Sequence, residues 1–506
     1  MANPPSDSVA RPNDARHPPG LYTLFFTEMW ERFSYYGMRA LLVLFMVAGV
    51  EKGGMALDEQ TANAIYGLYT AAVYLVALPG GWLADRWLGA RRAVWNGGWL
   101  IAAGHICLAL PHRQTFFVGL GVIVLGTSLL KPNISAMVGQ LYPEGGARRD
   151  AGFTIFYVGI NLGAALGPAL CGRLAERVGW HAGFGVAAVG MLLGLAQYRW
   201  MGWRLANVGA PPPASIDAQP GSRATTRHLM LAAVVGLAIV SGLALALAWL
   251  GPVILARYSI YLIVAVLAGY FAWIFDFGRL SALESRRVAV LVVLMAAASL
   301  FFTGFEQAGS SFTLFAERFT NRHIAWLNDD IPTAWFQSLN PIFIIALSPL
   351  FAALWKALGR RRLDPSTTAK FAFGLLQLGL AMMVMAWAAS LATRGTLVSP
   401  NWLVATYFLQ TMAELCLSPV GLSAVTKLAP ARFVGQMMGM WFAATALGNL
   451  LAAQFASRAL GDGEPIASGS DMAETFVLLG AITLSLGLSL LLAARPLGRW
   501  SGASDS

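Results

Sequence analysis

The feature that most constrains this chain is the recurrence of long apolar runs from Leu24 to the C-terminal end. Short segments with Arg, Asp, Pro and Gly separate the runs, and each run has about the 20 residues that a helix needs to cross a bilayer. An all-α membrane protein with fourteen spans is therefore predicted. The expected spans cover residues 24–49, 62–84, 93–110, 115–141, 152–172, 182–203, 229–250, 254–276, 289–315, 334–358, 369–391, 401–426, 435–459 and 473–494.

Composition and charge agree with a membrane location. The chain is 57% hydrophobic and 12% charged, whereas soluble domains average about 25% charged residues. Twenty-three of the 35 basic residues fall in the N-terminal arm, the C-terminal tail and alternate loops, and nine fall on the other side. The positive-inside rule then predicts that both termini lie in the cytoplasm. The net charge of +10 is explained by this bias, so no nucleic-acid partner is expected.

A Pro- and Ser-rich segment divides the runs into six and eight. The first two runs after it are almost free of ionisable residues and are expected to be plain lipid-facing helices. Without this pair, six spans remain on each side, as in two-bundle secondary transporters. The predicted divisions are an N-terminal arm 1–23, a first six-helix bundle 24–203, a linker 204–228, two extra helices 229–276, a connection 277–288, a second six-helix bundle 289–495 and a tail 496–506.

The first span carries charges at membrane depth. In "TEMWERFSYYGMRALL" six polar residues fall within about a 140° sector of a helix, namely Glu28, Glu31, Arg32, Tyr35, Tyr36 and Arg39. A charge in mid-bilayer costs about 2.5–3.5 kcal/mol, so this face must line a polar cavity or a paired network.

Other spans supply further polar groups. Lys131 lies in the fourth span, Glu306 and Glu414 lie in the second bundle, and Asn161 and Asn340 are buried amides. A lone buried Asn is more often an interhelical hydrogen bond than a ligand contact, so the role of these amides stays open at this point.

The buried acids outnumber the buried bases. Glu28, Glu31, Glu306 and Glu414 are four acids, and Arg32, Arg39 and Lys131 are three bases. One carboxylate therefore lacks a fixed cation and is expected to exchange a proton. The bases of the first bundle and Glu414 of the second suit the two ends of a zwitterion.

Several motifs resemble known transporters. "GGWLADRWLGARR" resembles the signature between the second and third helices of the major facilitator superfamily, with one extra residue before Gly89. "TEMWERFSYYGMRALL" matches the E-x-x-E-R-F-x-Y-Y pattern of the proton-dependent oligopeptide transporter family. "FTIFYVGINLGA", "FEQAGSSF", "QSLNPIFIIALSP" and "ELCLSPVGLSAVTKLAP" resemble further blocks of that family. One departure is "NLGAAL", where many members have a serine after the glycine.

The resemblance implies a major facilitator fold of the bacterial fourteen-helix type. It also implies that the protein lies in the plasma (bacterial inner) membrane and acts as a proton-coupled symporter that imports di- and tripeptides. It implies proton coupling at Glu28, Glu31, Arg32 and Glu306. It places the anchors of the peptide carboxylate at Arg39 and Lys131, and those of the amine and backbone at Asn161, Asn340 and Glu414. It places the pocket walls at Tyr35, Tyr36, Tyr74, Ser418 and Trp441.

The expected partners are small peptides, protons and the lipid bilayer, and the expected functional unit is a monomer. No cofactor or metal is expected, since the three cysteines show no metal spacing. The main alternative is a carrier of nitrate or another small non-peptide solute on the same fold. A membrane hydrolase is disfavoured, because no G-x-S-x-G or H-E-x-x-H motif is present. A peptide-sensing receptor is a third, weaker reading.

Overall fold

The computed structural model describes residues 17–210, 223–324, 328–361, 363–392, 396–458 and 468–502, and gives the backbone alone for 223–248. Of the predicted divisions, residues 1–16 of the arm, 211–222 of the linker and 503–506 of the tail lie outside the described residues. The helices are α1 (Pro19–Val47), α2 (Glu59–Leu83), α3 (Ala90–Ala109), α4 (Arg113–Gln140), α5 (Gly146–Arg177), α6 (Trp180–Met201), α7 (Arg223–Phe277), α8 (Ala282–Phe305), α9 (Ser311–Phe319), α10 (Leu339–Arg360), α11 (Thr367–Ala392), α12 (Asn401–Leu428), α13 (Val434–Arg458) and α14 (Gly469–Trp500).

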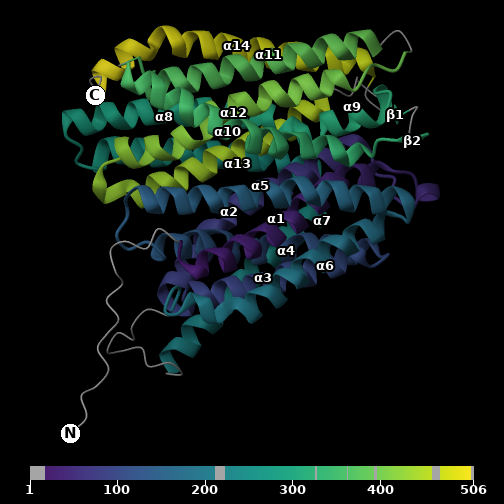
Figure 1. Cartoon of the computed structure of the whole chain (residues 1–506), viewed down its shortest axis with the longest axis horizontal. Helices are drawn as coiled ribbons and strands as arrows, with labels where there is room; N and C mark the ends of the chain where they lie inside the picture. The colour runs from purple at the N-terminus through teal and green to yellow at the C-terminus, as the bar shows by residue number, and fades with distance from the viewer. Residues whose placement is uncertain are drawn as a thin grey trace.

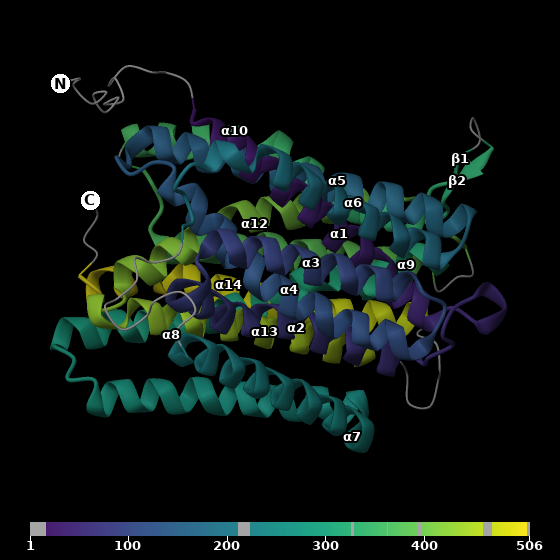
Figure 2. The same ribbon diagram turned by 90° about the horizontal axis from the view of Figure 1, so that it is seen from below.

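The helices run side by side along one axis, as Figures 1 and 2 show. Ten helical segments of the described part are long and apolar enough to cross a membrane. Helices α1, α3 and α13 are less apolar and lie among them. The architecture is the predicted all-α membrane fold.

The helices form two halves. Within α1–α6, helix α1 packs on α5 and α6, and α3 packs on α4 and α6. Within α8–α14, helix α11 packs on α14 and α12, and α13 packs on α8. We call α1–α6 the first half and α8–α14 the second half. The halves meet where α2 contacts α13 and where α5 contacts α10.

The two ends of the bundle differ. Helix α1 begins and α14 ends at one end, which we call the terminal end (Figure 1). The opposite end carries a two-stranded antiparallel hairpin of β1 (His323–Ile324) and β2 (Asp329–Asp330), and we call it the hairpin end. Having both chain ends on one side requires an even number of crossings, in agreement with the fourteen predicted spans.

The predicted pair of extra spans forms a single element, α7. Its two arms meet at Gly251, whose φ of 75° breaks the helix just before Pro252. Figure 2 shows α7 along one edge of the bundle. Its second arm is mostly exposed, with 11% of its apolar window buried, as expected of a lipid-facing helix. It contacts the bundle through Ala256 and Ile263, which are buried together with Ala64 of α2 and Ala446 of α13. Small residues let helices approach closely without any charge to reveal the contact, so hydropathy did not indicate this packing.

Some helix ends differ from the predicted divisions. Helix α7 begins at Arg223, inside the predicted linker, and α14 continues to Trp500, beyond the predicted end of the second bundle. Arg and other polar residues extend a helix past its apolar run, so hydropathy alone places such ends too early.

The extra residue of the "GGWLADRWLGARR" motif has a structural explanation. Residues Ala84–Leu88 form a π-helical turn, and the Gly89 N–H donates to the Ala84 carbonyl at 2.8 Å. A π turn holds one more residue than an α turn. Gly89 then adopts a φ of 73°, which glycine tolerates, and α3 starts at Ala90.

Candidate functional site

Helix α1 buries the charges of its motif in one paired network. Glu28, Glu31 and Arg32 are each at most 3% exposed. The Arg32 Nε lies 3.1 Å from Glu28 Oε1 and also pairs with Glu31 Oε2. One guanidinium thus serves two carboxylates, and the one-turn spacing of Glu28 and Arg32 accounts for the first of these pairs. A buried ion pair needs its partner, because an isolated buried charge is strongly destabilising.

Arg39, two turns further along α1, joins the two halves. Its Nη2 lies 2.7 Å from Glu306 Oε2, and its Nε donates to the Tyr66 hydroxyl at 2.7 Å. Arg39 and Glu306 are 7% and 3% exposed. The family resemblance implies separate roles for these two residues, with Arg39 as a carboxylate anchor and Glu306 as a protonation site. The structure brings them together, so in this conformation Arg39 is occupied by Glu306.

Glu306 lies at a break in the span predicted over 289–315. Helix α8 ends at Phe305, a 3₁₀ turn covers Glu306–Gly309, and α9 starts at Ser311. A Cβ on Gly309 would lie 1.8 Å from the Tyr66 hydroxyl, so only glycine permits this approach of the halves. Two side chains of α12 hydrogen-bond to carbonyls beside the break. The Gln410 Nε2 donates to the Phe305 carbonyl at 3.0 Å, and the Tyr407 hydroxyl donates to the Ala308 carbonyl at 3.4 Å.

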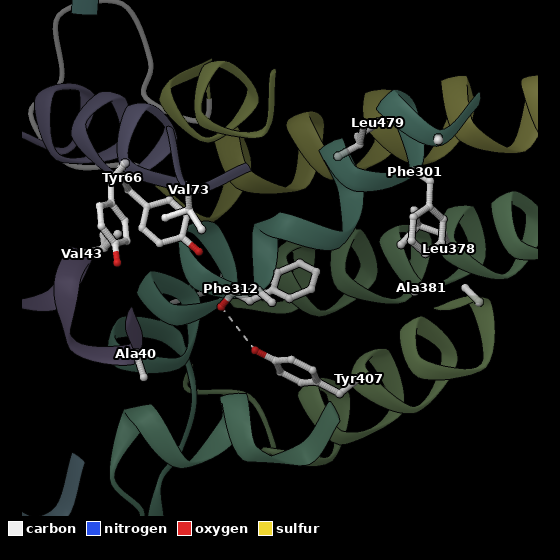
Figure 3. Packing of buried hydrophobic residues seen from close by; sticks show 14 of the residues in the cluster. Ala40, Val43, Tyr66, Val73, Phe301, Phe312, Leu378, Ala381, Tyr407 and Leu479 are labelled. Atoms are coloured by element: carbon white, nitrogen blue, oxygen red, sulfur yellow. Dashed lines mark hydrogen bonds between the residues drawn. The ribbon is translucent and has the colours of Figure 1, made fainter. Parts of the chain in front are cut away.

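The aromatic core behind this break spans the two halves. Figure 3 shows Val43 and Tyr66 of the first half in the same cluster as Phe312 and Tyr407 of the second. Phe312 and Tyr407 are in edge contact, with ring centroids 6.0 Å apart. This packing fixes the 3₁₀ turn and with it the position of the Glu306 carboxylate.

Lys131 and Glu414 are the charged site residues that find no ion pair within the described part of the chain. The Lys131 ammonium lies 4.8 Å from the ring centroid of Tyr74, a cation–π contact. The Glu414 Oε2 accepts a hydrogen bond from Asn340 Nδ2 at 2.9 Å. Lys131 belongs to the first half and Glu414 to the second, and both are half-buried.

The two buried amides have different partners. Asn340 donates to Glu414 and also to the Thr411 hydroxyl at 3.1 Å, so it orients the carboxylate from α10. Asn161 donates to the carbonyl of Tyr157 in its own helix at 2.9 Å. The structure therefore places Asn340 beside a predicted site residue and leaves the Asn161 amide bonded to its own backbone.

The predicted wall residues divide between buried and half-buried positions. Tyr35 is buried beneath Arg32, which lies 5.2 Å from its ring centroid, and Tyr36 is half-buried beside Arg39 at 5.6 Å. Trp441 is 4% exposed and packs on Gly421, where a Cβ would lie 2.3 Å from the indole. Ser418 is half-buried on α12. Trp441 is thus buried, whereas Tyr36 and Tyr74 are half-buried.

Sequence reasoning missed three tyrosines. Tyr66 binds Arg39, Tyr69 stacks on Tyr35 with centroids 6.4 Å apart, and Tyr157 is 38% exposed beside Asn161. The signal in the sequence was the repetition of tyrosine in "IYGLYTAAVY", which puts Tyr66, Tyr69 and Tyr74 near one face of α2.

Ion pairs between the halves at the hairpin end were missed as well. Arg173 and Arg177 of α5 both lie 2.5 Å from Asp329 Oδ2 of β2. Arg318 of α9 pairs with Glu59 of α2. The Arg173 hydrogen bond, with that of Arg177, lowers the pKa of the half-buried Asp329 carboxyl to about 2. No sequence spacing predicts such pairs, because their partners are more than 150 residues apart.

The polar contacts that the described residues make between the halves lie at the hairpin end and in the middle of the bundle. Besides the ion pairs, the Trp335 indole donates to the Ala169 carbonyl at 2.9 Å, and the Ser338 hydroxyl donates to the Ala165 carbonyl at 2.7 Å. The structure is therefore closed at the hairpin end.

Two halves that enclose buried, oppositely charged groups define a secondary transporter of the major facilitator type. The POT family model PTR2 matches residues 91–460. Accordingly, the chain belongs to the POT family, which is a transporter family.

The chain is 44% identical to the peptide transporter YePEPT of Yersinia enterocolitica, over 86% of this chain and 87% of the relative. It is 37% identical to a di-/tripeptide transporter of Lactococcus lactis subsp. cremoris, over 96% and 97%. Among solved structures, it resembles a peptide transporter POT in complex with sulfate, with a TM-score of 0.86, 42% identity and coverage of 97% and 98%. These matches extend over nearly the whole chain.

Proposed function

We propose that this protein is a proton-coupled symporter that imports di- and tripeptides by alternating access. The observation that carries the proposal is the pair of uncompensated charges, Lys131 in the first half and Glu414 in the second. A zwitterionic peptide supplies the missing partner to each of them. The names of the similar transporters agree with this substrate class.

The amine end of the peptide is assigned to the second half. Glu414 is held by Asn340 through a hydrogen bond to one of its oxygens, which leaves acceptor capacity for a substrate ammonium. Thr411 fixes the orientation of the Asn340 amide. Asn161 keeps its backbone bond in the free protein and is proposed to contact the peptide backbone only when substrate is bound.

The carboxylate end of the peptide is assigned to Lys131, and also to Arg39 once Glu306 has released it. Arg39 is bound by Glu306 in this structure. Protonation of Glu306 removes its negative charge and releases the guanidinium for the peptide carboxylate. Binding of the proton and binding of the peptide are then positively cooperative, because each favours the state in which Arg39 is free of Glu306.

The Glu28, Glu31 and Arg32 network is the second coupling element. Two carboxylates share one guanidinium, so a proton on either of them leaves the other a complete ion pair. An inward potential of 100 mV adds about 2.3 kcal/mol per charge moved, or roughly fiftyfold accumulation. We place the protein in the bacterial inner membrane as a functional monomer, with its terminal end in the cytoplasm. The closed hairpin end then faces outward.

The test is uptake of labelled dialanine into proteoliposomes with and without an inward proton gradient. Concentrative uptake should require the gradient, and an ionophore should stop it while counterflow exchange continues. Excess N-acetyl-dialanine, dialanine amide and nitrate are added as competitors. Concentrative uptake in sodium-free buffer without any gradient would contradict proton coupling. Competition by nitrate alone would favour a small-anion carrier, and binding without accumulation would indicate a receptor.

A further inference from the structure

The contact between α2 and the second half at the hairpin end buries a row of polar groups. We call this contact the α2 seam. Glu59 of α2 pairs with Arg318 of α9 at its outer limit. Deeper in the bundle, Tyr66 lies against Gly309, and a Cβ on Gly67 would lie 2.5 Å from the Cβ of Ala453 in α13. The seam thus runs between α2 on one side and α9 and α13 on the other.

Asn63 lies in the middle of this seam. It follows Glu59 by four residues and precedes Tyr66 by three, so the three side chains share one face of α2. The Asn63 side chain is 0% exposed. Neither its Nδ2 nor its Oδ1 has a hydrogen-bond partner among the described residues.

Two polar atoms on the opposite side of the seam share this condition. Ser310 Oγ, at the break between α8 and α9, and Asn449 Oδ1 of α13 are buried without a partner in the described part of the chain. They contrast with Thr70, whose hydroxyl donates to the carbonyl of Tyr66 in its own helix at 2.9 Å. Asn63, Ser310 and Asn449 thus place unpaired polar atoms on both sides of the α2 seam.

An unpaired buried amide opposes the closed state that buries it. Closing the seam removes water from Asn63 and gives it no protein partner, which costs free energy. Opening the hairpin end returns water to the amide. The ion pairs of Asp329 act in the opposite direction, because they form only when the halves are closed. The balance between the two states then depends on both contributions.

We propose that the buried Asn63 amide limits the stability of the closed hairpin end. It thereby keeps both the closed and the open state of the transport cycle accessible. This inference rests on the alternating access of the proposed function. It adds a residue that touches neither peptide nor proton in that scheme. Ser310 and Asn449 contribute to the same effect from the second half.

The test is Asn63→Leu, which replaces the amide by an apolar side chain of similar volume. Spin labels at positions 50 and 397, exposed on opposite halves at the hairpin end, report the opening in a background with Cys107, Cys171 and Cys416 changed to alanine. The variant should shift the distance distribution toward the closed state by about tenfold in population ratio. Counterflow exchange should slow, while equilibrium binding of dialanine in detergent stays within about twofold of the starting protein, since the binding groups are intact.

The matched control is Asn133→Leu. Asn133 is also buried, but it lies within the first half and donates to the Leu129 carbonyl at 2.7 Å, so the distribution should not shift. An unchanged or more open distribution in Asn63→Leu would overturn the inference, as would an equal shift in the control. Asn63→Ala, expected to shift the same way, replaces the leucine variant if that one does not fold. The spin-label distances are measured without peptide or proton gradient. They therefore test the role of Asn63 even if the uptake assay contradicts the proposed function.

Discussion

At the scale of single residues, the site is defined by which charges are paired and which are not. Arg32 satisfies Glu28 and Glu31, and Arg39 satisfies Glu306. Lys131 and Glu414 rely on an aromatic ring and an amide instead. The paired groups suit proton-dependent switching, and the other two suit a substrate that carries both charges. This division of labour leads to two predictions.

The first concerns Glu31. Glu31→Gln should abolish gradient-driven uptake and retain most of the counterflow exchange, because the amide imitates a permanently protonated carboxyl. The measurement is uptake and counterflow of labelled dialanine in parallel liposomes. The control is Glu144→Gln, an exposed carboxylate beside Arg148 at the terminal end, which should transport normally. Normal driven uptake in Glu31→Gln would remove this residue from the coupling scheme.

The second concerns the two ends of the peptide. Glu414→Gln should abolish the preference for a free over an acetylated amine, and Lys131→Gln should reduce the preference for a free carboxylate over an amide. In the starting protein each capped end should cost about 2–5 kcal/mol, the scale for truncated buried pairs. Competition curves with dialanine and its two capped forms measure this. Unchanged preferences in both variants would rule out recognition by the ends.

At the scale of elements, breaks in helices place the chemistry. The 3₁₀ turn at Glu306 directs that carboxylate at Arg39, and the π turn at Ala84–Leu88 sets the start of α3. Each break occurs where a glycine permits either a close approach or a positive φ. The breaks are therefore built into the sequence, although their partners lie in other helices.

A substitution of Gly309, where the two halves meet, tests whether a glycine is needed at such a break. Gly309→Ala should destabilise the protein by about 1–3 kcal/mol through overpacking against the Tyr66 hydroxyl. Thermal unfolding in detergent measures the loss, and adding Tyr66→Phe should recover part of it. Gly269→Ala in α7 is the control, because a Cβ there meets nothing within 4 Å. A neutral Gly309→Ala would show that the approach of Tyr66 is not constrained.

At the scale of the whole molecule, closure of the hairpin end depends on contacts between distant segments. Arg173 and Arg177 of the first half converge on Asp329 of the second. This contribution to closure exists only while Asp329 is ionised. The pKa of Asp329 is lowered from 3.8 to about 2 by hydrogen bonds from these arginines. A carboxyl group whose pKa is lowered in the closed state stabilises that state at pH values above its ordinary pKa. This stabilisation is lost as the pH falls through the lowered pKa.

The contribution of Asp329 to closure should therefore be constant from about pH 8 to 5. It should decline only between about pH 4 and 2. Asp329→Asn should open the hairpin end at every pH. Spin-label distances between positions 50 and 397 measure both effects. Asp330→Asn, which loses a contact to His323 within the hairpin, is the control and should stay closed. An Asp329→Asn variant as closed as the starting protein would contradict the role of this ion pair.

The sequence predicted a large part of this molecule. Apolar runs of bilayer length require helices, because backbone groups in lipid must bond within their own segment. The charged face of α1 required a paired or solvated environment, and the structure buries it in an ion-pair network. The charged site residues could be proposed from the sequence because an ionisable side chain inside a membrane span costs free energy and usually marks a functional site.

The sequence by itself determined the membrane-spanning helices and the charges of the α1 motif, since these depend on local hydropathy and on the price of burying a charge. Only the tertiary structure decided the pairing: Arg39 with Glu306 across the halves, Asp329 with two arginines, α7 against the seam of α2 and α13, and Asn63 with no partner in the described protein. Pairing depends on the positions of groups that are far apart in the chain. No periodicity along a single helix carries that information.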